Sequence, residues 1–137
     1  MRRIVFGFLA GFLGTIVFHQ IALALLHLAG IAPRGAWPMQ PVPPFGMPAV
    51  ISLSLWGGLW GAIMMPLIET RRGAAFWFTA LVFGAVFPTL VAWFVVAPLK
   101  HQAMAGGFAA KALVIGPIVN GAWGLGTALC YRVMSGR

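Results

Sequence analysis

Four long, predominantly apolar stretches dominate this sequence and limit what the chain can fold into. They cover approximately residues 4–29, 49–68, 74–97 and 112–134. A bilayer core about 30 Å thick needs about 20 helical residues, so each stretch is long enough to cross it. Because 61% of the 137 residues are apolar and only 7% are charged, a soluble domain of this size could not bury them. The sequence therefore predicts an all-α integral membrane four-helix bundle, with residues 1–137 forming a single transmembrane domain.

The basic residues indicate an orientation, because the cytoplasmic flanks of membrane spans are enriched in Lys and Arg. With the N-terminus inside, six of the nine basic residues lie on the inner side. These six are Arg2, Arg3, Arg71, Arg72, Arg132 and Arg137, and the outer three are Arg34, Lys100 and Lys111. We therefore expect both termini to be cytoplasmic. The basic residues are scattered in ones and twos, a pattern that does not favour nucleic acid as a partner.

The loops between the spans carry their own signals. Residues 30–48, the predicted outer loop, contain six of the ten prolines. Since proline fixes φ and lacks an N–H donor, we expect an extended, stiff cap that Trp37 and Phe45 anchor at the headgroup level. On the inner side Glu69, the lone acidic residue, is expected to form an ion pair with Arg71 or Arg72.

Two sequence shifts indicate an internal repeat. A shift of 63 positions places Gly57–Gly61 on Asn120–Gly124. A shift of 70 positions places Phe6, Phe8, Ala10 and Gly14 on Phe76, Phe78, Ala80 and Gly84. Chance matches between helices rich in Phe, Gly and Ala are the alternative explanation. If the repeat is real, the fold consists of two tandem helical hairpins related by an axis along the membrane normal.

Pairs of glycines at close spacing mark three of the four spans. Helices in lipid gain little from burying apolar surface against each other, so small residues allow the close backbone approach that holds them together. The candidate packing glycines are Gly7, Gly11, Gly57, Gly61, Gly121 and Gly124. Such notches serve either packing within the chain or docking of a second membrane protein, and the spacing alone does not distinguish these uses.

Four hydrogen-bonding side chains fall at one depth, roughly 12 to 15 Å from the outer ends at about 1.5 Å per residue. They are His19, Gln20, Thr89 and Asn120. Polar groups in hydrocarbon are unfavourable unless they are paired, and ionisable ones are candidates for function. Three interpretations stay open for this buried polar layer: interhelical hydrogen bonding, a solute or ion site, and a porphyrin or metal site.

Cofactor and catalytic signals are sparse. His27, near the outer end of the first span, and His101, in the second outer loop, are the candidate ligands for a haem or another porphyrin. Together with Met39, Met47 or Met104 they could instead bind copper. The chain has no Asp and a single Glu, so neither an acidic pair nor a Ser-His-Asp set can form. We therefore predict no catalytic residue and expect a protein that is not an enzyme.

The stretch PVPPFGMP at 41–48, followed by SLSLWGGLWG at 52–61 and preceded by FHQ at 18–20, carries a resemblance. The chain resembles a group of small four-span inner-membrane proteins of bacteria with no assigned activity. That resemblance implies a bacterial plasma membrane and supplies no function. The leading hypothesis is a non-enzymatic membrane subunit that packs with lipid, with another membrane protein or with its own copies. The alternatives are a small channel or transporter that uses the polar layer, and a haem- or pigment-binding membrane protein.

Overall fold

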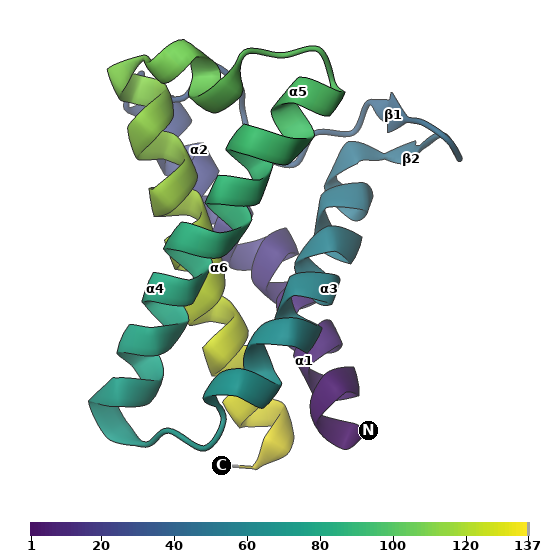
Figure 1. Ribbon diagram of the computed structural model, residues 1–137. Helices are drawn as coiled ribbons and strands as arrows, with labels where there is room; N and C mark the ends of the chain where they lie inside the picture. Colours follow the sequence, from purple (N-terminus) through teal and green to yellow (C-terminus); the bar gives the residue numbers. More distant parts are fainter. Residues whose placement is uncertain (137) are drawn as a thin grey trace.

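The computed structural model describes residues 1–136 and contains four helical spans, each long and apolar enough to cross a membrane. Their bounds are Arg2–Leu28, Ala49–Ile68, Gly73–Leu99 and Ala110–Ser135, which differ from the predicted limits by at most two residues. The predicted all-α four-helix bundle is confirmed. Both chain termini lie at one end of the bundle, here called the terminal end, and the opposite end is the loop end (Figure 1). Arg137, counted above among the inner cations, lies outside the described residues.

The first span bends in its middle. Its halves, α1 (Arg2–Leu13) and α2 (Gln20–Leu28), are joined by a π-helical segment, Gly14–His19, whose wider turns interrupt the α-helical ladder. Toward the terminal end α1 packs along α3 (Ala49–Ile68), whereas α2 lies beside α6 (Ala110–Ser135) toward the loop end (Figure 1). The first span therefore contacts both sides of the bundle.

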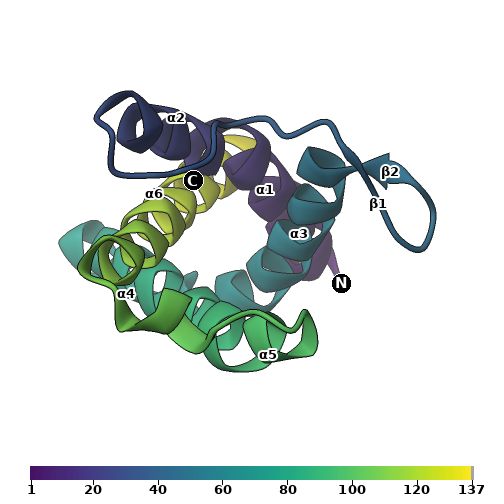
Figure 2. The same cartoon turned by 90° about the horizontal axis from the view of Figure 1, so that it is seen from above.

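The third span is also interrupted by a π-helical segment. It consists of α4 (Gly73–Val91), the π-helical segment Ala92–Val96 and a short α5 (Ala97–Leu99). A 3-10 segment, Met104–Phe108, then leads into α6. Viewed from the loop end, the helices surround the bundle axis, and α2 and α5 lie on opposite sides of it (Figure 2).

Residues 39–48 of the first outer loop form a projecting two-stranded hairpin, here called the hairpin arm. Strand β1 (Pro41–Val42) pairs antiparallel with β2 (Met47–Pro48), and the arm extends sideways from the loop end (Figure 1). The backbone N–H of Gly46 donates to the carbonyl of Val42 at 2.9 Å, and that of Ala49 donates to Gln40 at 3.0 Å. The arm is extended in its two short strands and is fixed to the start of α3.

The glycines of the first two spans pack directly against each other. A Cβ atom added to Gly11 would lie 2.1 Å from the carbonyl oxygen of Gly57, and one added to Gly7 would lie 2.6 Å from that of Gly61. These distances are far below van der Waals contact, so α1 and α3 approach so closely that their backbones touch. Both GxxxG pairs therefore serve packing within the chain.

The third and fourth spans meet through a second small-residue interface. A Cβ atom added to Gly84 would lie 2.4 Å from the carbonyl oxygen of Asn120, and one on Gly124 would lie 2.3 Å from that of Ala80. Gly121 instead faces a side chain, with the Leu81 Cδ1 atom 3.1 Å from an added Cβ. The fold thus contains two consecutive helix hairpins, α1 with α3 and α4 with α6.

The two interfaces also define how the hairpins correspond. Gly57 and Gly61 correspond to Asn120 and Gly124, which agrees with the predicted shift of 63. In the other helix, Ala80 and Gly84 occupy the places of Gly7 and Gly11, a shift of 73. The predicted shift of 70 for that helix was wrong by three residues. The predicted shift came from aligning phenylalanine residues in the two sequences. The contact between helix backbones determines which residues are equivalent in the structure.

Most contact between the hairpins runs along one side of the bundle. There α1 and the π-helical segment of the first span lie against α6, whereas α3 and α4 make few contacts with each other. The Trp123 indole N–H donates to the carbonyl of Gly11 at 3.0 Å and joins the two hairpins. The buried apolar core includes Ala10, Met64, Met65, Ile68, Phe76, Ala80, Phe83, Trp123, Ala128 and Tyr131. All four spans contribute to this core.

Candidate functional site

The predicted polar layer consists of two separate hydrogen-bonded pairs. The Gln20 amide Nε2 donates to the neighbouring His19 Nδ1 at 3.2 Å within the first span. Asn120 Nδ2 on α6 donates to Thr89 Oγ1 on α4 at 2.9 Å. Within residues 1–136 no hydrogen bond joins one pair to the other. The residues therefore do not form one continuous polar cluster.

Gln20 also holds the first outer loop. The backbone N–H of Trp37 donates to Gln20 Oε1 at 2.7 Å, and the Trp37 indole donates to the carbonyl of Ile16 at 2.9 Å. Gln20 is fully buried, and Ile16 lies in the π-helical segment, where carbonyls leave the regular α-helical pattern. Trp37 therefore fixes the loop to the first span, and its position at the headgroup level stays a prediction.

The remaining buried hydroxyls mostly bond to their own helices. Thr15 Oγ1 donates to the carbonyl of Gly11 at 3.0 Å, and Ser54 Oγ donates to that of Val50 at 2.8 Å. Such bonds back along the helix need no partner from another span. Within residues 1–136 one buried side-chain oxygen, Thr127 Oγ1, has no hydrogen-bond partner, and it faces Gly14.

The histidines proposed as haem ligands have different surroundings. His27 Nδ1 is hydrogen-bonded to the carbonyl of Ala32 at 2.9 Å, at the end of α2. His101 follows α5, and α2 and α5 lie on opposite sides of the bundle (Figure 2). No group of three or more His, Cys, Asp or Glu side chains in residues 1–136 could hold a metal ion. The haem interpretation stays a prediction that the fold does not favour.

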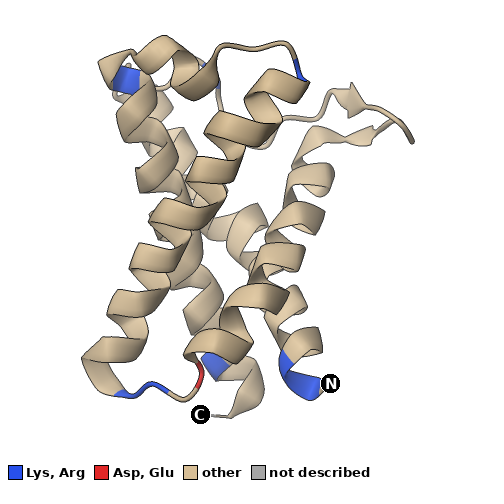
Figure 3. Ribbon diagram, in the orientation of Figure 1, with Lys and Arg blue, Asp and Glu red and all other residues tan. Residues whose placement is uncertain are grey.

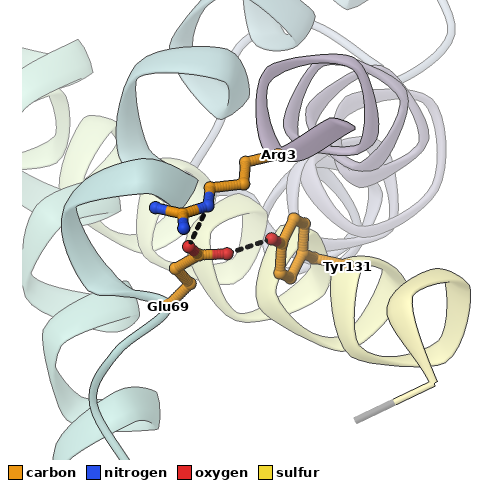
Figure 4. Close-up of polar contacts among 3 residues, drawn as sticks. All are labelled: Arg3, Glu69 and Tyr131. Atoms are coloured by element: carbon orange, nitrogen blue, oxygen red, sulfur yellow. Dashed lines mark hydrogen bonds and ion pairs between the residues drawn. The ribbon is translucent and has the colours of Figure 1, made fainter. Parts of the chain in front are cut away.

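At the terminal end, three side chains from three spans form a buried polar cluster. Arg3 Nε lies 2.7 Å from Glu69 Oε1, and the Tyr131 hydroxyl donates to Glu69 Oε2 (Figure 4). The Glu69 side chain is only 2% exposed, whereas that of Arg3 is 62% exposed. A carboxylate at the C-terminal end of α3 is disfavoured by the helix dipole, and Arg3 offsets this. The cluster ties α1, α3 and α6 together.

The expected ion pair of Glu69 with Arg71 or Arg72 does not form. Glu69 is the C-cap residue that directly follows α3, next to the buried Ile68. Arg71 and Arg72 lie in the exposed turn that follows. The buried carboxylate therefore faces α1 and α6, and closeness in sequence did not predict its partner. A usable signal was that the chain's one acidic residue and one tyrosine both fall at the same predicted membrane surface.

Arginine side chains and two clefts surround this cluster. The guanidinium carbon of Arg132 lies 4.3 Å from the ring centroid of Phe76 and 5.3 Å from that of Trp77, within cation–π range. A cleft of about 570 Å³ is lined by Glu69, Thr70, Arg71, Arg72, Phe76, Tyr131 and Arg132. A smaller one of about 210 Å³ is lined by Arg2, Arg3, Phe6, Glu69, Tyr131 and Ser135. The Glu69–Tyr131 pair borders both.

Neither a protein-family model, nor a curated protein, nor a solved structure matches this chain. The resemblance of the chain to small bacterial four-span proteins therefore stays a prediction. A function has to be argued from the residues described above.

Proposed function

We propose that this chain is a non-enzymatic subunit of the bacterial inner membrane that binds a partner membrane protein through the hairpin arm. The observation that carries the proposal is the placement of Phe45 at the turn of the arm. This aromatic side chain is 82% exposed although the backbone around it is fixed. An ordered, unpacked aromatic residue on a projecting element is typical of an anchor for a partner.

The arm is already ordered without a partner, so few additional groups lose conformational freedom when a partner binds. Its prolines restrict φ, and two backbone N–H groups at the start of α3, those of Ala49 and Val50, donate to the carbonyls of Gln40 and Pro38. Preorganisation of this kind lowers the entropic penalty of association. Met39 in the arm is also largely exposed, at 65%, and adds to its apolar surface. This surface suits the apolar flank of another membrane protein.

The glycine notches do not serve this binding. Gly7, Gly11, Gly57 and Gly61 are occupied by the contact between α1 and α3. A partner that approached them would have to separate the first hairpin. Of the two uses that the glycine spacing left open, these four glycines serve packing within the chain, and the arm is the surface proposed for the partner.

The distribution of basic residues supports a cytoplasmic terminal end. The charged residues lie at the two ends of the bundle and leave the middle of the spans uncharged (Figure 3). Five described arginines lie at the terminal end, and three basic residues lie at the loop end. Because Lys and Arg are retained in the cytoplasm, the N- and C-termini are cytoplasmic and the arm is periplasmic.

The orientation is tested by labelling intact cells with a membrane-impermeant thiol reagent. In a Cys130→Ala background, Arg34→Cys should be labelled and Arg71→Cys should be labelled only after the cells are opened. Labelling of Arg71→Cys in intact cells would overturn the orientation.

Photo-crosslinking in living cells tests the arm. A photoreactive phenylalanine derivative replaces Phe45 in one variant and Leu28 in the other. Leu28, at the end of α2, is equally exposed at 82%, but the arm projects beyond α3, away from α2 (Figure 2). We expect position 45 to give one protein adduct of defined mass and position 28 to give none. The same partner should appear in native mass spectra and be lost in Phe45→Ser. Equal adducts at both positions, or adducts with lipid alone, would contradict the proposal.

A further inference from the structure

We infer that the larger cleft at the terminal end binds the anionic phosphodiester headgroup of a membrane lipid, independently of the arm and its partner. The cleft of about 570 Å³ opens where the spans end, and Arg71, Arg72 and Arg132 line it. Three guanidinium groups around one cleft repel each other unless an anion lies between them. Arginine is also the side chain best suited to hold a phosphate by two parallel hydrogen bonds.

The carboxylate in the wall of the cleft does not neutralise these arginines. Glu69 is bound by Arg3 from the side of the smaller cleft and by the Tyr131 hydroxyl. Within residues 1–136, Arg71, Arg72 and Arg132 form no ion pair, and the Arg132 guanidinium group lies over the faces of two aromatic rings. A cation–π contact orients the guanidinium group but leaves its charge in place. The cleft therefore keeps a surplus of positive charge.

Two further features of the cleft fit an anion. Helix α4 begins at Gly73, so the positive end of its dipole lies next to Arg71 and Arg72. No acidic residue in the first turn of α4 neutralises this positive end. Thr70 adds a hydroxyl to the lining. Phe76, three residues into α4, supplies an apolar wall and holds Arg132 in position. The cleft thus combines positive charge, hydrogen-bond donors and a fixed geometry.

The position of the cleft favours a lipid over a soluble anion. Leu67 on α3 and Phe78 on α4 lie close in sequence to the cleft-lining turn and are 61% and 67% exposed. Acyl chains can pack on these apolar surfaces while the headgroup stays at the membrane surface. Basic pockets between membrane helices on the cytoplasmic side are the usual sites for anionic headgroups. A free phosphate would lack the apolar contact.

Native mass spectrometry of the full chain in mild detergent tests the inference. The probes are phosphatidylglycerol, phosphatidylcholine with the same acyl chains, and soluble glycerol phosphate. The cleft variant is Arg71→Gln/Arg72→Gln, and the matched control, Arg34→Gln/Lys100→Gln, removes two charges at the loop end. We expect the cleft variant to bind phosphatidylglycerol about thirtyfold more weakly, since each basic residue near a charged headgroup contributes about fivefold. The control should change this affinity less than about twofold.

Each contrary outcome overturns the assignment. Equal losses in both variants indicate attraction by net charge alone, and equal binding of phosphatidylcholine indicates acyl contact alone. Equally tight binding of glycerol phosphate identifies a soluble anion as the ligand. If the cleft variant keeps its phosphatidylglycerol but loses a bound acidic protein, the cleft is a protein-binding surface. An unchanged unfolding temperature in both variants confirms that folding is intact, and crosslinking at position 45 should persist in the cleft variant.

Discussion

The first hairpin brings glycine against glycine, with Gly7 and Gly11 of α1 on Gly61 and Gly57 of α3, whereas the second uses a mixed set of small and polar residues. In α4 and α6 these places are taken by Ala80, Gly84, Asn120 and Gly124. The second hairpin adds a hydrogen bond between side chains, from Asn120 to Thr89, close to the same contact. Both interfaces bring a carbonyl oxygen to within about 2.6 Å of a Cβ atom added at Gly11 or Gly7 in the first hairpin and at Gly84 or Gly124 in the second, so a larger residue at these glycines would clash. Close contact between two helix backbones thus requires small residues at the points of closest approach, and a GxxxG motif is one of several sequences that provide them.

A substitution at Gly11 is the strongest test of this comparison between the two hairpin interfaces. We expect Gly11→Ala to destabilise the bundle by about 3 kcal/mol or more, because the added methyl group meets the backbone carbonyl of Gly57, which cannot move without separating the helices. The measurement is the unfolding free energy in a detergent titration followed by circular dichroism.

Gly121→Ala is the matched control for Gly11→Ala. Sequence spacing marked both glycines as packing residues, but the neighbour of Gly121 is the movable end of the Leu81 side chain at 3.1 Å. Alanine is also favoured over glycine in a helix by about 1 kcal/mol, so the net change should lie within about 1 kcal/mol of zero. Similar losses in the two variants would show that glycine spacing, and not the backbone contact, determines stability.

Sequence reasoning predicted the features that depend on local composition. The four spans follow from length and hydropathy, and the glycines of the first hairpin follow from their spacing. The second interface was only partly predicted. Its Gly124 was identified as a packing residue, whereas Ala80, Gly84 and Asn120 appeared only in the repeat or the polar layer and were not predicted to pack.

Other features depend on three-dimensional placement that no local pattern encodes. Glu69 pairs with Arg3, 66 positions earlier in the chain, because both approach the same end of the bundle. Trp37 is bound to the first span because the π-helical segment presents the carbonyl of Ile16 to its indole N–H. The Trp123 indole reaches Gly11 only because the two hairpins are held together along α1 and α6. Each contact joins separate parts of the chain, so the final packing decides it.

The smallest expected effect concerns the hydrogen bond that distinguishes the second hairpin from the first. A double-mutant cycle with Thr89→Val and Asn120→Ala should give a coupling energy of about 0.6 kcal/mol, the average found for such bonds between membrane helices. The bond joins only α4 to α6, and the other half of the polar layer is bound to its own span and to Trp37. We therefore expect solute flux into liposomes to be the same for wild type, both single variants and protein-free vesicles. If flux above the protein-free level is lost in Asn120→Ala while the coupling energy stays small, the polar layer forms a transport pathway, and the hairpins differ in function as well as in packing.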